Sequence, residues 1–207
     1  MLLNKKKFTL LFLLLLLLSS CSEKKQDTDL VKLKDSYNSP SFVLGQAKQI
    51  LGNDVKQTFK GRFDRDTVIE VVAGTEIDKK TEWGISFNFL KLIDGKLTKI
   101  WQTGLLPGSF KGSLCDKIKF PSFDHELVYY NSKDFYLGSS GGEVFTYIIN
   151  FQDQKAYKAH LISEGKSVSL FISNNIDVPE IHNFFYSIFK RDYPNLKIVD
   201  KDVELKY

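Results

Sequence analysis

Apolar residues form one long run near the N-terminal end of the chain and many short runs after it. The long run, Phe8 to Leu18, carries no charge and follows three lysines. The short runs between residues 67 and 172 are rich in β-branched and aromatic residues, and Gly, Asp, Asn and Ser separate them. Such runs are typical of strands joined by turns. The pattern predicts a β-rich body with a short helix near each end.

The strand signals are closely spaced. Asp94-Gly95 is the dipeptide typical of a two-residue hairpin turn, so the runs on either side of it should pair. The connections are too short to hold a crossover helix, and neighbouring strands are therefore expected to be antiparallel. Strands are predicted at residues 67–73, 84–92, 97–103, 127–131, 134–137, 143–151, 156–162 and 167–172.

Helix signals stand at both ends of this region. Residues 40–51 are predicted as a helix because Ser39 can cap it, Pro40 suits its first turn and Gly52 ends it. A second helix is expected after Asp177, with Glu180 three residues on as in a capping box. Its apolar stripe should lie on the sheet. A last strand is expected within 195–205. The fold class is thus mainly β (α+β): an antiparallel meander or open sandwich with blade-like hairpins and a C-terminal strand-helix-strand unit.

The N-terminal segment has the parts of an export signal. Lys5 to Lys7 precede the apolar run, and Leu18-Ser19-Ser20-Cys21 follows it. This tetrapeptide resembles the lipobox of bacterial lipoproteins, in which the cysteine becomes the lipidated first residue of the mature chain. The alternative, a transmembrane anchor, needs ~20 apolar residues, and the run is shorter.

The lipoprotein resemblance implies a domain organisation and a location. Residues 1–20 are expected to be a signal peptide, 21–35 a flexible tether after the lipidated Cys21, and 36–207 a single β-rich globular domain. The segment 22–35 is rich in polar and charged residues, which is typical of a tether. The resemblance implies a protein that is lipid-anchored, through palmitate or a similar chain, to a membrane of the bacterial cell envelope.

Composition narrows the classes of partner. Removing residues 1–20 takes away three of the 29 basic residues and none of the 25 acidic ones, which leaves 26 against 25, or about +1. A near-neutral body argues against a nucleic-acid partner. The 17 Phe and 9 Tyr residues are expected to fill a β-sheet core, with a glycan-stacking platform as the alternative.

An internal repeat is indicated in the middle of the chain. The segment 61–72, Gly-Arg-Phe-Asp-Arg-Asp-Thr-Val-Ile-Glu-Val-Val, resembles the FG-GAP (VCBS-like) repeat. A second copy is indicated at 123–128, followed by a hairpin whose Asp153, Lys155 and Lys158 match Asp94, Lys96 and Lys99 in order. The resemblance covers roughly residues 60–162, with insertions or deletions between the copies.

In that family the acidic loop usually holds Ca²⁺. Asp64, Asp66 and Glu70 stand at ligand-type positions, but Arg62 replaces the first acidic residue. We expect Arg62 or Arg65 to neutralise the carboxylates in place of a cation. The second copy has fewer carboxylates, Asp124 and Glu126. The sequence therefore predicts a degenerate acidic loop, with no metal site and no cofactor.

Catalytic signals are weak. Residues 138–142 match the Gly-x-Ser-x-Gly elbow around Ser140, but the alternation that follows is that of a strand, whereas the elbow requires a helix. The histidines (His125, His160 and His182) lack metal-ligand spacing, and Cys115 is expected to be a small buried apolar residue.

We therefore expect no catalytic residues and no enzyme. The expected function is that of a non-catalytic binding or interaction module at the envelope, with an envelope protein or a glycan as partner. The alternative is an envelope serine hydrolase that uses Ser140 with His125 or His160.

Overall fold

The computed structural model describes residues 31–207, except 67, 134–140, 165–166, 174–175, 193, 195–196 and 200–207. The expected signal peptide, Cys21, Ser140 and the strand expected at 134–137 lie outside the described residues. The chain divides into two compact units, residues 1–43 and 44–207. Within the described part, no helix has the length and apolar character needed to cross a membrane.

The first unit is described from residue 31. Residues 31–36 are helical, and 31–35 of them lie in the segment expected as a flexible tether. The rings of Tyr37 and Phe42 meet edge to face at 5.2 Å. Helix α2 (Pro40–Leu51) has the predicted bounds and crosses the boundary between the units, with Gly52 at a φ of 90° after its last turn. Only glycine adopts such an angle without strain, which explains where the helix ends.

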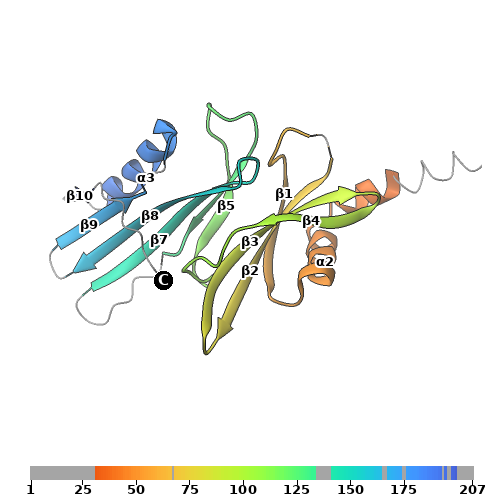
Figure 1. Cartoon of the computed structure of the whole chain (residues 1–207), viewed down its shortest axis with the longest axis horizontal. Coiled ribbons are helices and arrows are strands. Elements are labelled where there is room, and N and C mark those ends of the chain that lie inside the picture. The colour runs from red at the N-terminus through yellow and green to blue at the C-terminus, as the bar shows by residue number, and fades with distance from the viewer. Residues whose placement is uncertain are drawn as a thin grey trace, which may run out of the picture. The chain divides into compact units, whose positions relative to one another are not determined.

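The second unit begins with a four-stranded antiparallel sheet, called the first sheet (Figure 1). Asp94 and Gly95 have positive φ angles of 50° and 76°, as the predicted two-residue turn requires. The spatial order follows the chain: β1 (Val55–Gly61), β2 (Glu70–Lys79), β3 (Glu82–Ile93) and β4 (Lys96–Gln102).

The second sheet repeats the antiparallel meander and then adds a crossover. Helix α3 (Pro179–Asp192) connects β9 to β10, which lies parallel to β9 and completes the predicted strand-helix-strand unit. The spatial order is β10-β9-β8-β7-β6-β5. Its strands are β5 (Leu114–Ile118), β6 (Leu127–Asn131), β7 (Gly141–Asn150), β8 (Lys155–Glu164), β9 (Ser167–Ile172) and β10 (Lys197–Val199).

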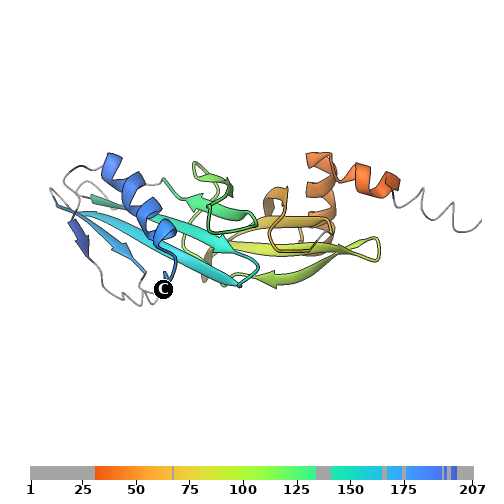
Figure 2. The ribbon, with the colours of Figure 1, turned by 90° about the horizontal axis from the view of Figure 1, so that it is seen from above.

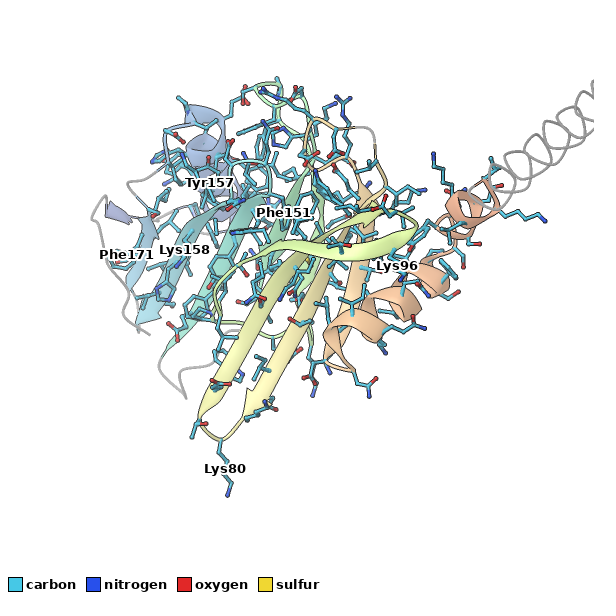
Figure 3. All side chains as sticks on the ribbon, turned by 45° about the vertical axis from the view of Figure 1, so that its right-hand side comes forward. Lys80, Lys96, Phe151, Tyr157, Lys158 and Phe171 are labelled. Carbon is cyan, nitrogen blue, oxygen red and sulfur yellow. The ribbon has the colours of Figure 1, made fainter. Side chains whose placement is uncertain are left out.

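An aromatic core joins the two sheets face to face. Phe151, labelled in Figure 3, contacts Phe63 at 5.6 Å and Phe89 at 5.4 Å between ring centroids. Phe87 of the first sheet meets Tyr130 of the second at 6.1 Å. These rings belong to one buried cluster, so the predicted use of aromatic residues as β-core is confirmed.

Helix α3 covers the opposite face of the second sheet (Figure 2). Ile181, Phe185 and Phe189 form its buried stripe, as the spacing predicts. The expected capping box does not form among the described contacts. Instead, Asp177 accepts from Lys155 Nζ at the start of β8 at 3.0 Å, and Glu180 accepts from Ser122 Oγ in the β5–β6 loop at 2.6 Å. The fold is the predicted mainly β arrangement of two sheets, which are antiparallel except for the β9–β10 pair.

Candidate functional site

The two loops that the repeat pattern singled out lie side by side. Residues 62–69 join β1 to β2, and residues 119–126 join β5 to β6. Arg62 N donates to Glu126 Oε2 at 2.9 Å, and Glu126 N donates back to Arg62 O at 2.6 Å. A Cβ on Gly61 would lie 2.5 Å from the same Oε2 and 2.7 Å from the buried ring of Phe63, and this close approach favours glycine. The structure thus brings both expected acidic segments together.

Glu70 forms the base of the first acidic loop. It begins β2 with only 1% of its surface exposed. The backbone N–H groups of Phe63 and Asp64 donate to its Oε2, the second at 3.1 Å. Carboxylate oxygens of Asp64, Asp66 and Glu70 lie within 4.8 Å of one another, so the three predicted residues form one cluster.

Lys91 supplies the positive charge of this cluster. It lies opposite Glu70 in the β2–β3 register, and its ammonium group forms ion pairs with both Asp64 and Asp66. The expectation that Arg62 or Arg65 would neutralise these carboxylates is therefore wrong. Arg65 instead reaches the second loop, with its Nε 3.2 Å from Asp124 Oδ2. A lysine ammonium among the carboxylates does not fit a metal-binding role for the loop as arranged.

Burial gives the carboxyl groups different pKa values. Burial, and then the adjoining Asp64, raise the pKa of Glu70 to about 8. Burial alone would also raise the pKa of Asp64, but the contacts from Glu70 and Lys91 outweigh it and lower that pKa to about 2. Oε1 of Glu70 is buried without a donor, which further favours the neutral form. At pH 7 the cluster therefore holds a proton on Glu70 and a negative charge on Asp64.

The second loop is organised around a buried histidine. His125 Nδ1 lies 3.0 Å from Asp124 Oδ1, and its Nε2 lies 3.0 Å from Asn150 Oδ1. Asn150 Nδ2 donates in turn to Asp153 Oδ2 at 2.9 Å. Both ring nitrogens of His125 are thus engaged, which is the arrangement of a histidine that joins a loop to the β7–β8 turn.

A second histidine pairs with a carboxylate on β7 and β8. His160 Nε2 lies 2.7 Å from Glu143 Oε2, and the imidazole stacks on Phe145 at 4.5 Å. Burial lowers the pKa of His160, although Glu143 opposes this. Its Nδ1 is buried and has no hydrogen-bond partner among the described residues. Since β7 begins at Gly141, a strand follows Ser140 where a nucleophile elbow would have a helix.

Cys115 and His182 stand apart from these groups. Cys115 lies on β5 and is half-buried, and burial raises the pKa of its thiol. A thiol with a raised pKa is a poor nucleophile at neutral pH. His182 lies half-buried on α3. The structure brings neither of them to the acidic loops by any described contact.

A pocket of about 340 Å³ opens on the face of the first sheet that is turned away from the aromatic core. We call it the sheet pocket. Ser86 and Asn88 of β3 belong to its floor, and they alternate with Phe87 and Phe89, which enter the core on the other face. The C-terminal end of α2 contributes Ile50 and Leu51 to its wall.

The floor of the sheet pocket is a network of polar side chains that bond to the protein. Ser86 Oγ donates to Thr103 O at 3.1 Å, and Thr103 Oγ1 accepts from Phe87 N at 3.0 Å. Asn88 Nδ2 donates to Thr75 Oγ1 at 3.2 Å. Ser86, Asn88 and Thr103 are buried. A network of this kind holds polar groups in fixed orientations, as a binding site requires.

A larger hollow of about 580 Å³ is lined by residues of β1, of β2 and of the loop before β5, and the charged ones include Lys56, Asp78 and Lys111. Its carboxylate Glu76 is already occupied, because it accepts from Ser109 Oγ at 2.6 Å and from Phe110 N at 3.0 Å. Glu76 thus fastens the loop that leads to β5. We therefore take the sheet pocket, with its buried polar floor, as the candidate functional site.

Sequence reasoning missed two of these features. The role of Lys91 depends on the strand register, and the sheet pocket depends on what flanks the outer face of the sheet. The alternation of Ser86 and Asn88 with aromatic residues is the signal that could have pointed to a polar face. A comparison of the chain with protein-family models, with curated proteins and with solved structures finds no match.

Proposed function

We propose that this chain is a membrane-anchored bacterial lipoprotein that acts as a non-catalytic binding module in the cell envelope. The observation that carries the binding role is the sheet pocket, where buried polar side chains are already held in place by hydrogen bonds. Such a floor loses little freedom when a ligand binds, because its side chains are ordered beforehand.

The anchor is proposed on the N-terminal pattern. Three lysines, an uncharged apolar run and Leu18-Ser19-Ser20-Cys21 give the order that a lipoprotein signal requires. A lipidated Cys21 would hold the protein at a membrane, and two or three acyl chains make such anchoring stable. The partner proposed for the folded part is an envelope protein or a glycan. Nucleic acid is not proposed, since the mature charge is about +1.

The arrangement of charged groups supports a non-catalytic role. Lys91 forms ion pairs with Asp64 and Asp66 of the acidic loop, and His125 is engaged through both ring nitrogens. The hydrogen bonds and ion pairs of both side chains thus join loops and strands of the protein to one another.

An envelope serine hydrolase is the second candidate, and the Glu143–His160 pair is the observation in its favour. A carboxylate that orients an imidazole is the arrangement that activates a serine nucleophile. Ser140 precedes β7, three residues before Glu143 in the sequence. Ser140 itself lies outside the described residues.

A fluorophosphonate probe separates the two candidates. The binding module should remain unlabelled, because a serine without an activating base and an oxyanion hole does not react with the probe. The comparison uses the full chain, Ser140→Ala and His160→Gln, with a known serine hydrolase as a positive control. Covalent labelling that is lost in both variants would establish the hydrolase and refute the non-catalytic module.

A further inference from the structure

We propose that the sheet pocket binds a small aliphatic zwitterion: an amino acid or short peptide that carries a free ammonium group and a free carboxylate. This inference rests on the proposed binding function and adds a small ligand of the sheet pocket to the envelope protein or glycan proposed above as partner of the folded part. Three properties of the pocket support it: the hydrogen-bonding character of its floor, the charges at its edge and the side chains of its walls.

The first step concerns Asn88. Its Nδ2 donates one hydrogen to Ala73 O at 3.3 Å and the other to Thr75 Oγ1 at 3.2 Å. Because a backbone carbonyl can only accept, the amide nitrogen must face Ala73 and Thr75. Both hydrogens are used, and no described residue donates to Oδ1. Asn88 therefore offers an acceptor to a ligand.

The hydroxyl groups of the floor likewise offer hydrogen-bond acceptors to a ligand. Thr75 Oγ1 donates to Ser86 O at 3.2 Å, and Ser86 Oγ donates to Thr103 O at 3.1 Å. Each hydroxyl has a single hydrogen, which these donations use. Thr75 Oγ1 already accepts from Asn88 Nδ2, and Ser86 Oγ already accepts from Thr103 Oγ1 at 3.4 Å, so one lone pair on each oxygen remains for a ligand. A ligand that suits this floor must supply the hydrogens, as an ammonium group or a peptide N–H does.

Two opposite charges line the pocket. Asp54 contributes a carboxylate, and Lys99 contributes an ammonium group. Lys99 Nζ gives one hydrogen to Gln102 Oε1 at 2.9 Å and keeps others for a ligand carboxylate. One charge of each sign matches a ligand that carries both charges and has no net charge.

The walls are aliphatic. Ile50 and Leu105 are each more than two-fifths exposed, at 42% and 43%, and Leu51 and Ile77 lie beside them. The described residues that line the pocket include no aromatic ring, whereas a ring would offer a sugar a stacking surface. A volume of about 340 Å³ lies at the low end of ligand sites, which suits a small ligand with an aliphatic side chain.

The test measures binding to the full chain in detergent by isothermal titration calorimetry. The probes are leucine and Leu-Leu, each also with a blocked ammonium group (N-acetyl) or a blocked carboxylate (amide), and maltose as an uncharged polyol. We expect the ligands with both groups free to bind. The N-acetyl and amide forms should each bind about tenfold more weakly, because a charged group of the pocket loses its partner. Leucine and Leu-Leu distinguish a free amino acid from a peptide.

Paired variants locate the ligand. Asp54→Asn and Lys99→Gln should each weaken the zwitterion by about three- to fivefold, as expected for exposed ion pairs. Lys99→Gln should leave the affinity of the amide-blocked ligand unchanged, because that ligand has no carboxylate. The matched controls are Asp78→Asn on β2 and Lys96→Gln on β4, the latter labelled in Figure 3.

The controls lie on the other face of the sheet. Lys99 pairs with Leu90, which shares a face with Asn88, whereas Lys96 pairs with Ile93 on the opposite face. Asp78 lies three residues from Thr75 on the same strand and likewise faces away. Since Asp54, Lys99, Asp78 and Lys96 are exposed, their variants should keep the melting temperature of the wild type.

The inference would be overturned by a lack of binding of leucine and Leu-Leu, by equal binding of the blocked ligands, or by tighter binding of maltose. Binding of maltose that depends on Lys99 or Asp54 would overturn the zwitterion and leave the proposed binding function standing. Equal effects of the pocket variants and their controls on affinity would contradict the placement of the ligand in the sheet pocket.

Discussion

At the scale of single residues, one proton on Glu70 reduces the negative charge of the acidic loop. Glu70 is buried with a pKa of about 8, whereas Asp64 has a pKa of about 2 beside the Lys91 ammonium. A protonated Glu70 leaves one fewer negative charge next to a single lysine. The proton therefore reduces the repulsion among the three carboxyl groups of the loop.

This proton makes stability depend on pH. Between the unfolded value of 4.5 and about 8, folded Glu70 keeps a proton that unfolded Glu70 has released. The contribution of Glu70 to the free energy of unfolding is therefore complete below pH 4.5 and is lost as the pH rises towards 8. Over this range the free energy of unfolding falls by at most about 1.4 kcal/mol per pH unit. Asp64 acts in a different window, because its contribution is lost only as pH falls from 3.8 towards 2.

Glu70→Gln should remove this slope, since the amide can accept from the backbone N–H groups and donate to Asp64 without titrating. Urea denaturation of the wild type, Glu70→Gln and the exposed control Glu82→Gln at several pH values from 5 to 8 measures it. The control should follow the wild type. Identical slopes in wild type and Glu70→Gln would show that Glu70 is ionised in the folded protein.

At the scale of elements, local signals predicted the helices and the central strands. The bounds of α2, β6 and β9 match the expected ranges because caps, turns and apolar runs coincide there. Strands β1 and β5 were missed. Both are short edge strands without a continuous apolar run, and most of their residues are half-buried or exposed, so the sequence carries little strand signal there.

Other features depend on contacts that the sequence does not display. Lys91 meets the acidic loop only because the register places it opposite Glu70. Asp64, Asp66 and Glu70 could be grouped from their spacing, but their counter-ion could not. The sheet pocket likewise combines β3 with the distant end of α2. Long-range pairing of this kind is decided by register and packing, and short-range periodicity carries no information on it.

Helix α3 offers a test of packing at this scale. Phe185 is fully buried against the second sheet, whereas the next residue, Tyr186, is 36% exposed. Phe185→Ala should lower the free energy of unfolding by about 3–5 kcal/mol, through lost burial and the cavity left behind. Tyr186→Ala, the matched control, should change it by about 1 kcal/mol or less. Urea denaturation measures both, and equal effects would contradict the packing of α3.

At the scale of the whole molecule, two consecutive meanders are stacked in the unit 44–207, and α3 covers the second of them. Strand β7 is buried along nearly its whole length, because the first sheet covers one of its faces and α3 packs against the other. Its apolar run is therefore nearly continuous, whereas half-exposed strands alternate. The sheet pocket lies on the outer face of the first sheet, which the second sheet does not cover.

The central claim is that Cys21 holds this folded body at a membrane. Metabolic labelling with a palmitate analogue tests it most directly in cells that express the full chain. We expect labelling of the wild type and of Cys115→Ser, the control that removes the other of the two cysteines, and no labelling of Cys21→Ser. Equal labelling of wild type and Cys21→Ser, or labelling that is lost in Cys115→Ser, would contradict the account.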